Sequence, residues 1–155
     1  MKLARLFAAD DRGTTLVEFA LVAPVLILTL VACLDFARAM NAYVTIENAS
    51  REGARYAAVH PTSDPAAIQA AVAARVVPLD TAQLNGRVHV FYDAGRGVQP
   101  WPTGGIPRSV PGPAPVVVRV DVSYPWNAAT WLVGSFFAAS GSRTFASSSS
   151  MEAIQ

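Results

Sequence analysis

The chain has 155 residues, which gives room for one modest domain with an appended segment but not for two full domains. Apolar residues make up 52% of it and charged residues only 15%, against a usual charged share of about 25%, so we expect part of the chain to face lipid. The formal net charge of +1, with arginines scattered along the chain, argues against a nucleic-acid partner.

The residue types that carry catalysis or bind metals are few and far apart. Cys33 is the single cysteine, so no intrachain disulfide can form, and His60 and His89 lie in no recognisable metal-ligand spacing. The sequence offers no evident nucleophile–base pair, carboxylate dyad or phosphate-binding loop. We therefore expect no enzyme, no catalytic residue, no metal and no cofactor.

A short leader, residues 1–13, precedes an apolar run from Leu16 to Leu34 in which Glu18 is the one ionisable side chain. A bilayer core of about 30 Å needs about 20 helical residues, so this run is long enough to span it. The basic residues of the leader favour a cytoplasmic N-terminus with the remainder exported. A secretory signal peptide fits less well, because its apolar part is usually about 7–15 residues long and does not normally begin with a carboxylate.

The helical pattern continues beyond the apolar run. Apolar and small residues recur at intervals of three or four from Phe36 to Ala57, which predicts one continuous helix from Thr14 to about Val59, roughly 69 Å long. Pro24 removes one backbone hydrogen bond inside this helix and is expected to kink it.

Two acid–base pairs support the same helix. Asp35 and Arg38 are three residues apart, and Glu47 and Arg51 are four apart with the acid first. Each pair adds about 0.2–0.5 kcal/mol to helix stability, which favours continuity past the membrane.

Glu18 has two interpretations. A carboxylate at the centre of a spanning helix costs about 2.5–3.5 kcal/mol, less near an interface, so Glu18 can simply lie in the headgroup layer. If the chain were cut after Gly13, however, Thr14 would carry a new amino group one helical turn away, in the same chain or a neighbour.

Two segments resemble a known family. The string from Gly13 to Phe19, Gly-Thr-Thr-Leu-Val-Glu-Phe, resembles the processing site of type IV prepilins. The string Ala-Ser-Arg-Glu-Gly-Ala-Arg, which contains Arg51, Glu52, Gly53 and Arg55, resembles the segment that follows the spanning helix in TadE-like proteins, pseudopilins of the tight-adherence branch of type IV pilus systems. The alternative for the second string is an ordinary solvated helix face.

The resemblance implies a pilin-like α+β fold: a leader (1–13), a transmembrane and spine helix (14–59) and an exported small domain with an antiparallel sheet (60–155). It implies a minor pilin-like subunit that aids assembly of an adhesive Tad/Flp-type pilus in the inner membrane. A prepilin peptidase would cut between Gly13 and Thr14, and Glu18 would register the subunit during assembly. The implied partners are that peptidase, other pilin and pseudopilin subunits, the inner-membrane assembly platform and the lipid bilayer.

Two other outcomes remain open. Leu30-Val31-Ala32-Cys33 has the form of a lipobox, in which Cys33 would become a lipidated N-terminus and residues 1–32 would be lost as a signal. Alternatively, the chain is a membrane-anchored binding module that is never processed. In the first reading Cys33 is a lipid anchor, and otherwise it is a small apolar residue of the membrane helix.

The remainder of the chain predicts a small α+β domain. Asp64 is expected to cap a second helix that runs to about Val77, with the apolar face Ile68, Val72 and Val76. Strands are expected at Arg87–Tyr92 and Val116–Tyr124, and a third at Arg143–Met151, although Ser147–Ser150 is a poor core former.

The connections between these strands carry two further expectations. The Gly- and Pro-rich stretch 94–115 predicts a long loop with Trp101 exposed. The uncharged stretch 126–140 predicts an amphipathic helix that packs on the sheet or touches the membrane surface.

Overall fold

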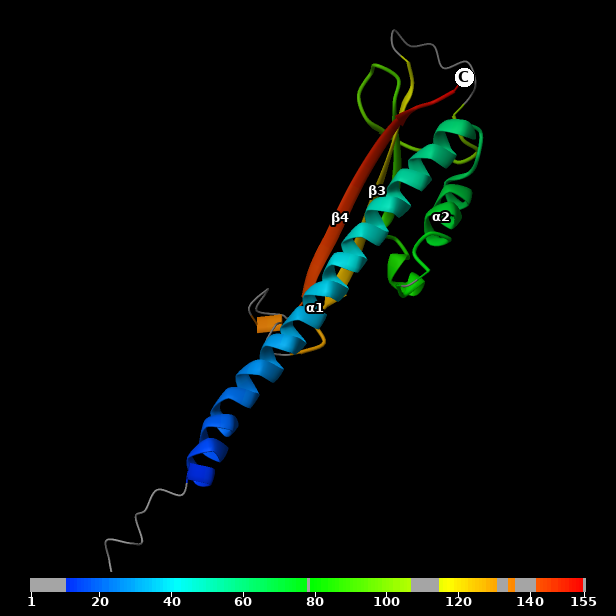
Figure 1. The fold of residues 1–155 in the computed structure, drawn as a ribbon. Coiled ribbons are helices and arrows are strands. Elements are labelled where there is room, and N and C mark those ends of the chain that lie inside the picture. The colour runs from blue at the N-terminus through cyan, green and yellow to red at the C-terminus, as the bar shows by residue number, and fades with distance from the viewer. Residues whose placement is uncertain (1–10, 78, 107–114, 131–133, 136–141, 155) are drawn as a thin grey trace, which may run out of the picture.

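The computed structural model describes residues 11–77, 79–106, 115–130, 134–135 and 142–154. Its helices are α1 (Asp11–Val59), α2 (Pro65–Ala73) and a short 3-10 helix, η2 (Thr81–Leu84). Its strands are β1 (Val88–Asp93), β2 (Gln99–Pro100), β3 (Val117–Asn127) and β4 (Ser142–Glu152). The predicted α+β architecture, a long N-terminal helix followed by a small antiparallel sheet, is confirmed (Figure 1).

The sheet has the strand order β2-β1-β3-β4, and every neighbouring pair is antiparallel. The C-terminal half of α1 packs against β3 and β4, while α2 contacts α1 and β1. The N-terminal half of α1 projects away from the domain (Figure 1). One helix is therefore both the spine of the domain and a long extension from it.

Strand β3 shows the predicted alternation of buried apolar and exposed polar side chains, which lets one face of the strand pack in the core. Val118, Val120 and Val122 are buried, whereas Arg119 and Asp121 lie on the opposite face and form an ion pair. The strand continues three residues beyond the predicted end at Tyr124. Pro125 is tolerated there because β1 pairs no further than Val122, so this part of β3 has β4 as its one strand neighbour.

The third predicted strand is confirmed as β4, an edge strand that includes the serine run. Ser147 and Ser149 pair with Val122 and Val120 of β3 and are half-buried. The Ser147 hydroxyl lies 2.9 Å from the Ser50 hydroxyl of α1. The hydroxyl of Ser147 is thus satisfied beneath the helix by its hydrogen bond to α1.

The second helix is shorter than predicted. It ends at Ala73 rather than near Val77, although Val76 still turns into the core. Asp64 is the N-cap residue but makes no capping hydrogen bond, because its carboxylate accepts one from the Gly104 amide at 2.6 Å.

The prediction that Trp101 is exposed is wrong. Its side chain is 6% exposed, and its indole Nε1 donates a hydrogen bond to the Ser63 carbonyl at 2.9 Å. The Ile106 amide donates to the Pro61 carbonyl at 2.6 Å. Residues 99–106 therefore pack over the turn between α1 and α2 and hydrogen-bond to it; we call this segment the clasp. The Gly and Pro content of the loop did not indicate these contacts.

The helix predicted over 126–140 is wrong at its start, because Trp126 and Asn127 belong to β3. Trp126 is 5% exposed and continues the buried alternation of the strand. Gly134 and Ser135 are helical. Residues 131–133 and 136–140 of this prediction lie outside the described residues.

Candidate functional site

The N-terminal half of α1 exposes apolar side chains that the domain does not cover. An 18-residue window of this helix has a mean hydropathy of 2.5 with none of it buried, and by length and composition the helix can cross a membrane. Leu16, Phe19 and Leu21 are exposed by 70%, 69% and 71%. A continuous apolar surface of this size needs a partner such as a bilayer, so this half of α1 indicates a single-pass membrane protein.

The predicted cleavage junction lies at the start of that half. Gly13 and Thr14 are exposed in the first turn of α1, and a Cβ added at Gly13 would meet nothing within 4 Å. Glu18 is exposed on the following turn and makes no hydrogen bond or ion pair with any described residue. The folded chain thus brings these three residues onto adjacent turns and leaves the Glu18 carboxylate available to another group.

Pro24 and Cys33 lie further along the same half. The helix continues on both sides of Pro24, and Cys33 is an exposed free cysteine within it. The kink at Pro24 and the lipidation of Cys33 both remain predictions.

Gly53 of the family motif lies where three elements meet. A Cβ added to it would be 2.5 Å from Val72 Cγ2 of α2 and 3.2 Å from Val120 Cγ1 of β3. Any other residue would push α2 or the sheet away from α1. The glycine is buried, so the solvated-face alternative is wrong at this position.

Glu52, next to Gly53, links α1 to Arg75 in the segment just after α2. Its carboxylate accepts hydrogen bonds from Arg55 Nε at 3.0 Å and Nη2 at 2.7 Å, and Arg75 Nη2 lies 3.7 Å away. The hydrogen bond from Arg55 lowers the pKa of Glu52; burial opposes this, and the charges of Arg55 and Arg75 add to the lowering. Arg51 pairs with Glu47 one turn earlier, so the two motif arginines lie on the solvated side as ion-pair partners.

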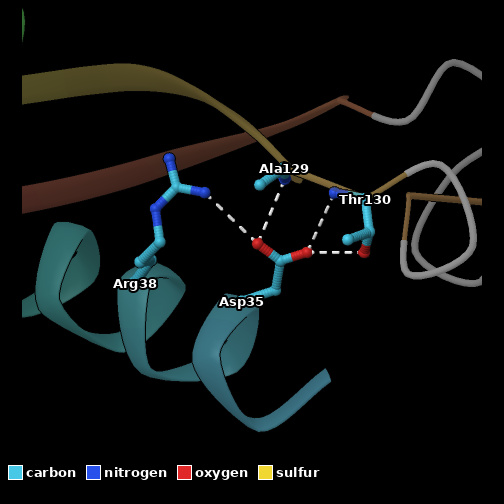
Figure 2. Close-up of polar contacts among 4 residues, drawn as sticks. All are labelled: Asp35, Arg38, Ala129 and Thr130. Carbon is cyan, nitrogen blue, oxygen red and sulfur yellow. Dashed lines mark hydrogen bonds and ion pairs between the residues drawn. The ribbon is translucent and has the colours of Figure 1, made fainter. Parts of the chain in front are cut away.

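A second polar cluster lies at the base of the domain, at Asp35, the first residue after the apolar run. The Asp35 side chain is 2% exposed and accepts hydrogen bonds from Thr130 Oγ1 at 2.7 Å and from the amides of Ala129 and Thr130, both at 3.1 Å (Figure 2). Arg38 Nη1 donates a further hydrogen bond at 3.2 Å. This carboxylate therefore fastens the segment after β3 to α1 where the helix leaves the domain.

Sequence reasoning identified Asp35 only as a partner of Arg38, and that pair is confirmed. It missed the bonds to residues 129 and 130, which are more than ninety residues away in sequence. One signal was present: a carboxylate directly after a membrane-length run must find donors if it is buried.

Among the residues that the structure describes, no group of three or more His, Cys, Asp or Glu side chains is placed to hold a metal ion. His60 instead stacks on Tyr56, with ring centroids 4.5 Å apart, at the C-terminal end of α1.

These features define a class of protein: a small α+β domain carried on the distal half of a helix whose other half is a candidate membrane anchor. Residues 13–55 match the family described as TadE-like protein, which confirms the predicted resemblance and indicates a protein associated with Tad pilus systems. The match begins at Gly13 and ends at Arg55, so it covers both strings that carried the resemblance. Comparison with curated proteins and with solved structures finds no match.

Proposed function

We propose that this chain is a minor pilin-like subunit, a pseudopilin, that aids assembly of an adhesive Tad/Flp-type pilus after leader cleavage between Gly13 and Thr14. The role is structural rather than enzymatic. The observation that carries the proposal is the TadE-like match over 13–55, which includes the junction, the apolar half of α1 and the Arg51–Arg55 motif.

The exposure of Glu18 supports a role in subunit registration. After cleavage the amino group of Thr14 would carry a positive charge within about 6 Å along the helix axis. An opposite charge at this range attracts the Glu18 carboxylate, and a neighbouring subunit can supply that charge as well as the same chain. Lateral packing of spanning helices would then be in register only where the two charges meet.

In this proposal the prepilin peptidase acts from the cytoplasm on residues 1–13, and α1 remains in the inner membrane with residues 60–155 exported. The assembly platform and other pilin and pseudopilin subunits contact the apolar half of α1. The buried Gly53 junction keeps the exported domain fixed on the spine, so that placing the helix also places the domain.

Mass spectrometry of the mature N-terminus tests the proposal directly. A chain that begins at Thr14 supports it, and Gly13→Leu should then abolish cleavage by filling the peptidase subsite for glycine. A lipidated N-terminus at Cys33 would overturn it in favour of an envelope lipoprotein. An intact Met1 would overturn it in favour of an unprocessed, membrane-anchored binding module.

A further inference from the structure

The face of the sheet opposite α1 carries a small hollow, which we call the outer hollow. Its volume is about 250 Å³. Three of its lining side chains are long and basic, and three are short: Arg87, His89 and Arg119, and Ser123, Ala146 and Ser148. The strand register explains the shape, because Ser123 of β3 lies across from Ala146 of β4. Short side chains next to each other on β3 and β4 leave a depression beside the longer Arg87 and His89.

One ion pair lies within the outer hollow. Arg119 Nε and Nη2 donate hydrogen bonds to the two carboxylate oxygens of Asp121, at 2.8 Å and 2.9 Å. Burial raises the pKa of Asp121, but hydrogen bonds from Arg119 and Ser148 and the charge of Arg119 lower it further, so that it lies below its usual value. Asp121 is therefore an ionised acceptor, and this pairing neutralises Arg119.

Arg87 supplies a cation that remains available. Its guanidinium makes no hydrogen bond or ion pair with any residue that the structure describes. In the sequence, no Asp or Glu occurs in residues 107–114, 131–133 or 136–141, so these segments supply no carboxylate to it. Asp93, on the same face, lies six residues further along the chain, about 20 Å away. His89 is exposed two residues from Arg87 on that face, so the outer hollow offers a guanidinium with an imidazole beside it.

The complement of this hollow is a ligand with one anionic group and several neutral hydroxyl groups. A guanidinium such as that of Arg87 binds a carboxylate through two parallel hydrogen bonds. The Asp121 carboxylate and the Ser148 hydroxyl can bond to neutral hydroxyl groups. A densely acidic peptide fits less well, because Asp121 would repel its further carboxylates.

We propose that the outer hollow binds a uronic acid residue of an anionic polysaccharide. The uronate carboxylate pairs with Arg87, and the ring hydroxyls bond to Asp121 and Ser148. This inference goes beyond the proposed function, since it concerns what the sheet domain binds rather than how the chain is processed and assembled. Binding is measured on the isolated chain, so it can fail while leader cleavage is confirmed, and the reverse.

Isothermal titration calorimetry of the full chain in detergent micelles tests the proposal, with hexamers of galacturonic acid and of mannuronic acid as probes. At least one hexamer should bind, and its methyl ester, which is the same sugar without charge, should bind about tenfold more weakly. Hexaglutamate, which has six carboxylates and no ring hydroxyl, should also bind about tenfold more weakly. Binding of neither uronate hexamer, or equally tight binding of hexaglutamate, would overturn the proposal.

Three variants locate the binding. Arg87→Gln should lower the affinity for the uronate hexamer about tenfold, because it removes a charge-assisted pair. Ala146→Phe should lower it as much by filling the outer hollow without changing any charge. Arg96→Gln is the matched control, because Arg96 is an exposed arginine in the turn after β1 and does not line the hollow. Equal affinity in Arg87→Gln and in the unaltered chain would contradict the proposed site.

Nuclear magnetic resonance on the unaltered chain keeps the test decisive should a variant fold poorly. The chain has two histidines, and His60 serves as the internal control because it follows α1 and does not line the outer hollow. At constant pH, the uronate hexamer should shift the ring proton signals of His89 and leave those of His60 in place. A shift of neither histidine, or an equal shift of both, would overturn the proposal.

Discussion

Gly53 is a residue at which α1 packs closely against α2 and β3. By helix propensity alone, Gly→Ala in a helix interior is favoured by about 0.8–1 kcal/mol. Here the added methyl group would lie 2.5 Å from Val72 Cγ2, and a β-branched side chain has little freedom to move aside. Overpacking of this kind costs about 1–3 kcal/mol, so the packing penalty should exceed the gain in helix propensity.

We therefore expect Gly53→Ala to lower the midpoint of thermal unfolding by about 3 °C, measured by circular dichroism in detergent micelles. Gly13→Ala is the matched control, because it is the same substitution in the same helix with nothing within 4 Å of the new Cβ. A midpoint for Gly53→Ala at or above that of Gly13→Ala would contradict the packing account.

The second prediction for a single residue concerns Asp35. Asp35→Asn keeps the shape but removes the charge and one acceptor oxygen, so at least one of the donors on residues 129 and 130 loses its partner. The expected loss is about 1–3 kcal/mol. It should appear locally, as faster hydrogen–deuterium exchange of the Ala129 and Thr130 amides.

Arg38→Gln separates this effect from the ion pair. Arg38 is 59% exposed, so its bond to Asp35 should contribute no more than about 0.5 kcal/mol. Exchange at Ala129 and Thr130 should therefore stay unchanged in Arg38→Gln. Equal acceleration in both variants would mean that Arg38, rather than the Asp35 carboxylate, holds the segment.

At the scale of elements, the clasp formed by residues 99–106 holds the turn between α1 and α2. Trp101 contributes both a buried ring and a hydrogen bond to Ser63, so Trp101→Ala removes packing and leaves a carbonyl without its donor. The expected cost is about 3–5 kcal/mol, a large part of a small domain's stability. Tryptic cleavage after the exposed Arg96 should accelerate, and the thermal midpoint should fall.

Val98→Ala serves as the control for the clasp. Val98 precedes β2 and is 59% exposed, so its truncation should change neither the cleavage rate nor the midpoint. Unchanged proteolysis in Trp101→Ala would show that the remaining contacts, such as the one from Ile106 to Pro61, suffice to hold the turn.

The elements differ in how far their sequences determine them. Apolar periodicity was strong enough to predict α1 to its last residue, since Pro61 follows directly on a long regular stripe. The alternation around Val120 similarly predicted β3. The clasp was missed because Trp101 is buried by contacts with a turn almost forty residues earlier, and no local pattern encodes such a contact.

The residues of the candidate site likewise differ in how far the sequence alone predicted them. The junction from Gly13 to Glu18 is a local motif, and the family match covers it as the sequence predicted. The Gly53 junction and the Asp35 cluster depend on Val72, Val120 and Thr130, which come from three other parts of the chain. The motif string was recognisable from sequence, but the reason for its glycine appeared only with the packing of α2 and β3 around it.

At the scale of the whole molecule, the two halves of α1 differ in what they contribute: one carries the core, and the other, in the proposed function, serves assembly. Its distal half carries the core residues Ile46, Ala49 and Ala57, all fully buried, while its first half contributes almost nothing to the core. A change in the first half should therefore alter assembly without altering the fold. Glu18 is well suited to test whether a change in the first half of α1 affects assembly but not folding. Its side chain is exposed and makes no hydrogen bond or ion pair with any described residue.

Glu18→Ala and the isosteric Glu18→Gln should both leave the thermal midpoint unchanged and still allow cleavage after Gly13, because neither touches the core or the glycine. Both should impair pilus assembly, since a neutral side chain cannot pair with the amino group of Thr14. Glu152→Ala, which removes an exposed carboxylate from β4 at the opposite end of the domain, should assemble normally. Mature N-termini by mass spectrometry and pili by electron microscopy give the two readouts. Normal piliation in Glu18→Gln would show that the charge has no role, and loss of cleavage would place Glu18 in recognition by the peptidase instead.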